Sequence, residues 1–169
     1  MSRPDRIEFG RPGHFTVGCM GEPGHRVFFI QIFGNDTELS IKCEKQQAQA
    51  LALQLMRLVE ELPGGAAGSA AAVAPAESLP PGELAWVVGA VRIGVDADQA
   101  IIVLLEELLF DEDGEPVEGD GASASVALTP DQVRAFAAQV TELIAGGRPI
   151  CRLCDQPIDP DGHACPRLN

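Results

Sequence analysis

The hydrophobic positions along the chain form two successive groups of strand-like segments, and each group is followed by a helical stripe. In the first group, short apolar segments predict three strands, at 15–19, 26–33 and 38–42. Residues that tolerate tight turns separate these strands, so we expect them to pair as an antiparallel meander. Leucines and an alanine that recur at intervals of three and four then predict a helix over 44–62.

The same pattern returns in the second half of the chain. Three further strands are predicted, at 85–95, 99–108 and 122–128. A helix follows them, because Thr129 is a suitable cap, Pro130 suits the first helical position and Gln132 stands three residues after the cap. We therefore predict an α+β fold in which two duplicated antiparallel units, each of three strands and one helix, form one domain.

These elements divide the sequence into four regions. The first meander and its helix occupy 1–63, and the second meander and its helix occupy 83–147. Between them, residues 64–82 are rich in alanine, glycine and proline, which predicts a linker. The last region, 148–169, contains a turn-rich loop with few apolar side chains, so we expect only a bound metal to give it a fixed shape.

Four metal-binding side chains crowd this last region. Cys151 and Cys154 are separated by two residues, and His163 and Cys165 follow after a short polar loop. Two thiolates at that spacing reach one ion across a tight turn, and the second pair completes a tetrahedron of the kind that holds zinc. Because four protein ligands leave no coordination position for water, we predict a structural zinc knuckle and not a catalytic site.

The composition is that of a globular protein with a strong acidic charge. Hydrophobic residues make up 46% and charged residues 22% of the 169 residues. The formal net charge of −13 repels phosphate backbones and anionic lipids, so we expect no nucleic-acid partner and no membrane partner. The carboxylates between 106 and 120 lack the alternating ligand pattern of a calcium loop, and we interpret them as a solvated hairpin tip.

The cysteines and the start of the chain bear on the cellular location. The first residues lack the apolar core of a signal peptide, and no apolar run is long enough to span a bilayer. We therefore expect a cytoplasmic protein. In that reducing setting Cys19 and Cys43 are expected to be free thiols, and the clustered cysteines of the tail are better explained by metal than by disulfides.

A second candidate site lies in the first predicted turn. Glu22, His25 and Arg26 stand close together in a segment with two glycines and a proline. A hairpin turn accounts for this composition, and a binding or catalytic loop would also use such side chains. Glu44 suits the positive end of the dipole of the first helix, and with Lys45 it is a further candidate for the neighbourhood of this loop.

Three stretches of the chain resemble one bacterial family. They are residues 21–31, the helix start at 44–46, and the ending 151–169 with its Cys-x-x-Cys, Asp-Pro, Gly-His and Cys-Pro-Arg pattern. The chain resembles the domain of unknown function 3090 family (DUF3090) over nearly its whole length. This resemblance implies a cytoplasmic bacterial protein with zinc on the four tail ligands, and it implies no particular activity.

The sequence leads to two functional hypotheses. The preferred one is a noncatalytic zinc-binding protein that acts as a protein-interaction or adaptor module with a protein partner. Few histidines and no assembled nucleophile leave little for catalysis, whereas the acidic body and the neutral, arginine-bearing tail offer surfaces of different character. The alternative is an enzyme or small-ligand-binding protein that uses the Glu22/His25/Arg26 loop.

Overall fold

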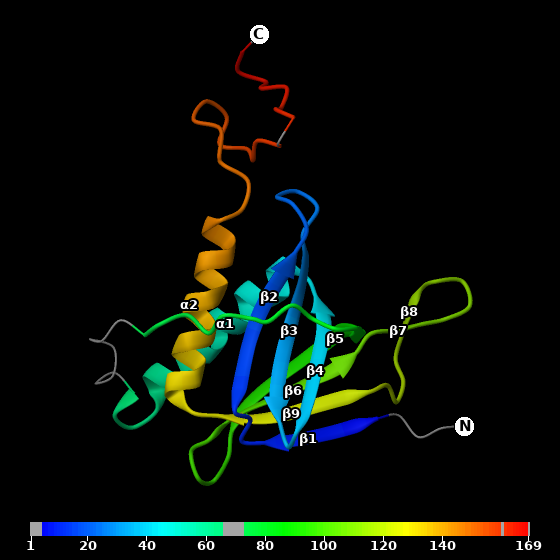
Figure 1. Ribbon diagram of the computed structural model, residues 1–169, viewed down its shortest axis with the longest axis vertical. Coiled ribbons are helices and arrows are strands. Elements are labelled where there is room, and N and C mark those ends of the chain that lie inside the picture. Colours follow the sequence, from blue (N-terminus) through cyan, green and yellow to red (C-terminus); the bar gives the residue numbers. More distant parts are fainter. Residues whose placement is uncertain (1–4, 66–72, 160, 169) are drawn as a thin grey trace.

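A curled β-sheet carries two helices on one face, and the C-terminal tail extends beyond the end of the second helix (Figure 1). The computed structural model describes residues 5–65, 73–159 and 161–168. The sheet has seven strands in the order β1-β9-β6-β5-β4-β3-β2. These strands are β1 (Arg6–Gly10), β2 (His14–Met20), β3 (Val27–Gly34), β4 (Thr37–Cys43), β5 (Leu84–Val95), β6 (Ile101–Glu107) and β9 (Ser123–Leu128). The helices are α1 (Lys45–Glu61) and α2 (Pro130–Ala145).

The two predicted meanders are both present, and they belong to one sheet. Strands β2, β3 and β4 pair antiparallel, and so do β5, β6 and β9. Strand β4 then pairs with β5 in parallel, with Ser40 opposite Leu84 and Lys42 opposite Val87. A parallel pair requires a long crossover, which α1 and the segment after it supply. The sheet is therefore mixed and not wholly antiparallel.

Strand β1 was not predicted from the sequence. It has five residues, of which Phe9 alone is buried, and it pairs in parallel with β9 at the edge of the sheet. Only residues 11–13 connect it to β2, which lies at the opposite edge. Because so short a connection spans about 14 Å at most, the sheet must curl until its two edges meet at one end. Asn35 closes this corner by donating to the carbonyl oxygens of Glu8 and Phe9, both at 3.4 Å.

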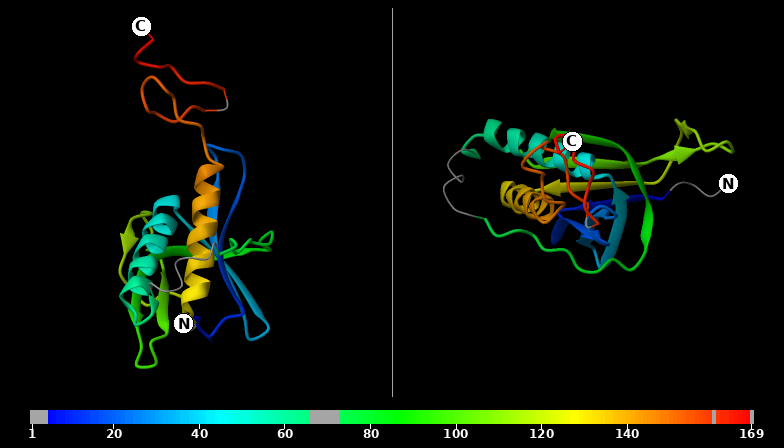
Figure 2. Two further views of the ribbon diagram at one scale, coloured as in Figure 1. Left: turned by 90° about the vertical axis from the view of Figure 1, so that its left-hand side faces the viewer. Right: turned by 90° about the horizontal axis from the view of Figure 1, so that it is seen from above.

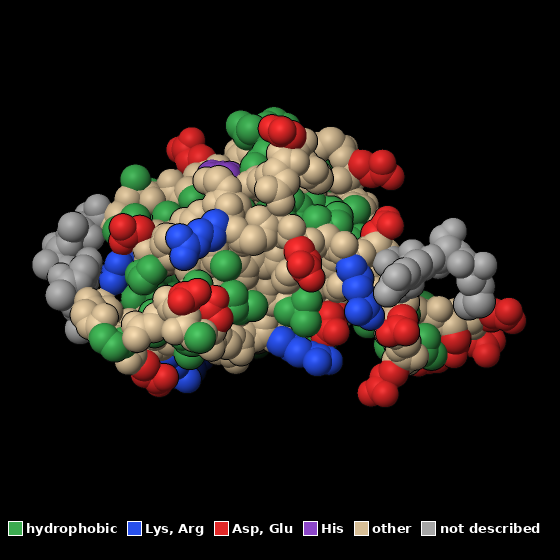
Figure 3. Space-filling view, turned by 90° about the horizontal axis from the view of Figure 1, so that it is seen from below, with side chains coloured by type: hydrophobic (Ala, Val, Ile, Leu, Met, Phe, Trp, Pro, Cys, Tyr) green, Lys and Arg blue, Asp and Glu red, His purple; other side chains and the backbone are tan. Residues whose placement is uncertain are grey.

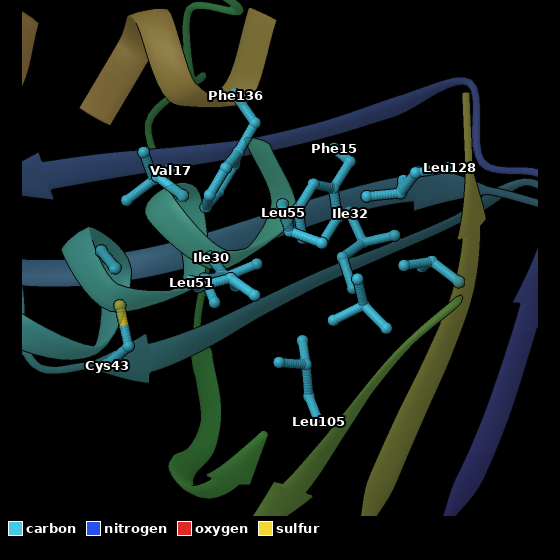
Figure 4. Close-up of a cluster of buried hydrophobic side chains, with 14 of the residues drawn as sticks. Phe15, Val17, Ile30, Ile32, Cys43, Leu51, Leu55, Leu105, Leu128 and Phe136 are labelled. Carbon is cyan, nitrogen blue, oxygen red and sulfur yellow. The ribbon is translucent and has the colours of Figure 1, made fainter. Parts of the chain in front are cut away.

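The hydrophobic core lies between the helices and the concave face of the sheet. Alternation along β3 turns Phe28, Ile30 and Ile32 toward the helices. Figure 4 shows Phe136 reaching from α2 toward Phe15 on β2, and their ring centroids are 4.9 Å apart. The buried helix residues that complete this layer are Ala48, Leu51, Ala52, Leu55 and Val59 on α1 and Val133, Phe136, Gln139 and Val140 on α2.

The opposite face of β2 and β3 is covered by residues 73–82, which we call the covering segment (Figure 2). This segment belongs to the predicted linker 64–82, whose residues 66–72 lie outside the described part of the chain. Buried Gln31 accepts from Leu79 N at 2.9 Å and donates to Leu79 O at 3.2 Å, and buried Thr16 donates to Ala76 O. The side-chain amide thus satisfies both of its polar ends against one residue.

A glycine allows the covering segment to approach this closely. A Cβ at Gly18 would collide with the ring of Phe29 and with the Oγ of Ser78. The alternation of β2 and β3 places Gly18 and Phe29 on the same face as Thr16 and Gln31. The covering segment is therefore a layer of the fold, although it has no helix or strand of its own.

The acidic stretch forms a separate small hairpin, as the sequence predicted. Strands β7 (Leu109–Phe110) and β8 (Pro116–Val117) pair antiparallel, and Asp111 accepts from the backbone of Asp113 and Glu115 in the turn between them. Figure 3 shows acidic side chains gathered at this end of the molecule. Neither of the described helices is long and apolar enough to cross a membrane.

Candidate metal centre

The tail after α2 begins as a tight hairpin. Ile150 and Pro157 form an antiparallel bridge. Inside it, Cys151 N donates to Gln156 O at 2.8 Å, and Ile158 N donates to Pro149 O at 2.8 Å. These backbone bonds return the chain on itself within a few residues. The hairpin therefore forms the frame on which the first pair of cysteines is placed.

Backbone turns bring the predicted ligands to one point. Asp155 N donates to Cys151 O at 2.9 Å, and Asp155 itself adopts a left-handed φ of 58°, which an aspartate tolerates better than most residues. The return turn is closed by Gly162 N, which donates to Asp159 O at 2.8 Å, and Gly162 has a φ of 90°. His163 and Cys165 follow this second turn and face the first pair.

The four ligand atoms lie within 4.8 Å of one another. The Sγ atoms of Cys151 and Cys165 are 3.9 Å apart, and Sγ of Cys154 is 3.3 Å from Nε2 of His163. A tetrahedral zinc with Zn–S bonds of about 2.3 Å and a Zn–N bond of about 2.05 Å would set these separations near ~3.8 Å and ~3.6 Å. The cluster thus has the dimensions of a site for one metal ion, and all five cysteines of the chain are free.

The local backbone favours the thiolate form of one cysteine. The N–H groups of Leu153 and Cys154 donate toward Sγ of Cys151 and lower the pKa of its thiol from 9.0 to about 7. For Cys154, a hydrogen bond from the backbone of Gln156 favours the thiolate, but burial and the neighbouring thiols outweigh it, so the pKa is raised. Since the thiolate is the metal ligand, these backbone hydrogen bonds favour the form of Cys151 that binds a metal.

Burial differs between the members of the cluster. Cys151 and Cys165 are buried, whereas Cys154 and His163 are partly exposed. Three sulfurs and one imidazole are the donor set of closed structural zinc sites, and no carboxylate belongs to the cluster. The residues present can hold a metal ion with four protein ligands.

One ion pair and one arginine connect the tail with the rest of the protein. Arg148 Nη1 donates to Asp159 Oδ1 at 2.6 Å, and this pair lies against Gly24 in the first loop. Arg26 from the same loop donates to Leu143 O at 2.9 Å and to Gly146 O. Because these carbonyls end α2 without a helical partner, Arg26 caps the helix from which the tail leaves.

The other predicted site, the loop with Glu22, His25 and Arg26, does not converge. Glu22 and His25 are exposed, and His25 N donates to Glu22 O at 2.9 Å in a simple turn. Arg26 turns away toward α2 and lines a pocket that it shares with Glu44 and Lys45 but not with the other two loop residues. The spatial neighbourhood of Arg26, Glu44 and Lys45 was expected, whereas Glu22 and His25 do not line the pocket that these three residues share.

Comparison with known proteins gives one finding. Residues 7–165 match the family model described as "Protein of unknown function (DUF3090)", and this range contains all four ligands of the cluster. Comparison with curated proteins gives no match. Comparison with solved structures gives no match either.

Proposed function

Since the chain belongs to the DUF3090 family, whose description names no activity, we propose that it is a noncatalytic cytoplasmic zinc protein that acts as a protein-interaction or adaptor module. The observation that supports this proposal is the convergence of Cys151, Cys154, His163 and Cys165 on one point of a tail that extends beyond the body of the protein (Figure 1). Such a site gives a short segment a fixed shape, and a fixed shape is what a docking surface requires.

Zinc is the metal that fits the donor set best. Thiolate and imidazole ligands in a tetrahedral arrangement favour zinc over the hard cations that prefer oxygen. The four protein ligands occupy the whole coordination sphere, so the ion would hold structure and would activate no water. The free state of all five cysteines is consistent with a reducing compartment.

The surface around the cluster supports a role in binding another protein. Ile150, Leu153 and Leu168 are exposed by 56%, 47% and 72%, respectively. Arg152 and Arg167 are exposed in the same tail. We call these five residues the knuckle surface. Arginine is enriched at protein interfaces, and together with the exposed apolar side chains it would suit an apolar patch bordered by carboxylates.

The docking role is tested by affinity capture from the cytoplasmic fraction of the source bacterium, where the protein itself should be recovered. We expect wild type to retain partner proteins that Leu153→Ser and Cys154→Ser lose, because the first variant removes an apolar contact and the second removes a ligand. Leu53→Ser is the matched control, since Leu53 is 56% exposed but lies on α1, far along the chain from the tail. Retention of no partner by wild type, or equal retention by all variants, would contradict the proposal.

The internal duplication is a further part of this proposal. Both α1 and α2 follow the third strand of a meander, and both begin with a backbone N–H bonded to a glutamine three residues later, Gln47 and Gln132. In addition, β4 has the parallel neighbour β5, and β9 has the parallel neighbour β1. Superposition of β2-β3-β4-α1 on β5-β6-β9-α2 tests the duplication. The Cα atoms of all three strands and of the helix should coincide. A helix that crosses its meander in a different direction in the two units would contradict a common origin.

A further inference from the structure

A pocket lies at the end of the sheet where β3 begins, β4 ends, α1 begins and α2 ends. Its volume is about 390 Å³, within the range of roughly 300–1,000 Å³ that small-molecule pockets occupy. Its charged lining comes from three segments of the chain and consists of Arg26, Lys42, Glu44, Lys45 and Arg148. The metal cluster does not contribute to this lining, so the pocket is a site distinct from the metal centre.

The charge of the pocket is opposite to that of the protein. The chain has 12 basic and 25 acidic residues. The pocket gathers four of the basic side chains and only one carboxylate, that of Glu44. Like charges that converge in a concave site repel one another and raise the local concentration of anions. An acidic protein that collects four of its 12 basic side chains in one pocket thereby gains a preference for a negatively charged ligand there.

Some of these basic side chains have N–H groups that are available to a ligand. Among the residues that the structure describes, Lys42 and Lys45 form no ion pair. The two Nη atoms of Arg26 bond to carbonyls of α2, but its Nε is buried without a hydrogen-bond partner. A buried donor without a partner is unfavourable. Arg148 remains tied to Asp159 at 2.6 Å.

The start of α1 also contributes to the electrostatic potential of the pocket. Lys45 is the first residue of the helix, and α1 carries no acidic residue in its first turn. The positive end of the helix dipole lies at this pocket beside Lys42 and Lys45, together with Glu44, which is the N-cap of α1 and forms a capping box with Gln47. Phosphate, with several oxygens and more than one negative charge, makes use of such an array better than a single carboxylate does.

From these observations we propose that this pocket binds a small molecule that carries a phosphate group, with Lys42 and Lys45 as its main contacts and Arg26 in its wall. The inference stands on the pocket and its charges, and it holds whether or not the knuckle surface binds a partner. The proposal gives a role to the region around Arg26. Glu22 and His25 have no part in that role, because both are exposed and lie outside the pocket lining.

Isothermal titration of the zinc-loaded full-length protein with inorganic pyrophosphate tests the inference. We expect saturable binding by wild type and about tenfold weaker binding by Lys42→Gln, because one charge-assisted contact is lost. Lys45→Gln, at an exposed position, is the second variant and avoids any effect on strand β4. The matched control is Arg57→Gln, which removes one charge from an exposed position of α1 outside the pocket and should leave the affinity within about twofold.

Three outcomes would overturn the inference. If wild type shows no saturable binding of pyrophosphate, the pocket does not bind ligands that carry a phosphate group. Equal weakening by Arg57→Gln and by the two lysine variants would show that only the overall charge matters. Acetate binding as tightly as pyrophosphate, at the same ionic strength, would show that the pocket does not select phosphate. Loss of partner capture by Leu153→Ser leaves all three measurements unchanged, so the two proposals fail separately.

Discussion

Replacement of Cys154 by serine is expected to remove zinc from the protein. Wild type should contain about one zinc per chain, as four ligands around one ion require, and Cys154→Ser should contain close to none. A serine hydroxyl is a far poorer ligand than a thiolate, and the remaining three groups leave the coordination sphere open. Elemental analysis of protein purified without added chelator measures this. Cys19→Ser, which changes a cysteine on β2 outside the cluster, should retain the full metal content.

The same substitution should change the tail and spare the body of the protein. Structural zinc supplies about 10–16 kcal/mol of binding free energy in small zinc domains, and a tail with few apolar side chains has little else to order it. Amide hydrogen exchange in 150–165 should therefore become fast in Cys154→Ser, while exchange in α1 and β3 stays slow. A variant that keeps its metal, or wild type that contains none, would show that the four residues do not form a zinc site.

Replacement of Phe136 by alanine should destabilise the fold by about 3–5 kcal/mol. Phe136 is fully buried on α2 and packs against Phe15 on β2, so its removal leaves a cavity between helix and sheet (Figure 4). Urea unfolding, followed by far-UV circular dichroism, gives the free energy of unfolding. The matched control is Phe110→Ala, since Phe110 is 53% exposed on the small hairpin and its loss should change stability by less than about 0.5 kcal/mol.

The comparison between these two phenylalanine substitutions tests whether α2 packs against the sheet. If Phe136→Ala lowered stability no more than Phe110→Ala, α2 would not pack against the sheet as described. A large loss for Phe136→Ala with an unchanged zinc content would instead show that the core and the metal centre are separate sources of order. We expect the second result, because no ligand of the cluster belongs to the hydrophobic core between helices and sheet.

The elements that the sequence predicted correctly are those with a local signal. Six strands and both helices were found from periodicity and turn residues, and the cap at Thr129 is present, with Gln132 N donating to Thr129 Oγ1 at 3.2 Å. Strand β1 and the two parallel pairings were missed or left open. Their partners lie far away in the chain, and no turn links them, so neither spacing nor turn chemistry indicates them.

The position of the covering segment on the sheet could not be predicted from its own sequence. Its alanines, prolines and glycines predicted a linker, and composition alone gave no reason to place it on the sheet. Its order comes from partners elsewhere in the chain: the amide of Gln31 and the hydroxyl of Thr16. These two polar residues in predicted strands were a possible signal, because a buried polar group needs hydrogen-bond partners.

The sequence by itself determined the cluster of four residues that could hold a metal ion and the strand-and-helix pattern, since both depend on residues a short distance apart: a two-residue spacing between cysteines, a turn, or one helical repeat. Only the tertiary structure decided how the sheet curls, what covers its outer face, and that Arg26, Lys42, Lys45 and Arg148 line one pocket. The physical reason is that the charge and the shape of a pocket depend on residues that lie close together in space, whether or not they are close in the sequence. Residues from the starts and ends of four different elements meet only when the sheet and the two helices have packed together.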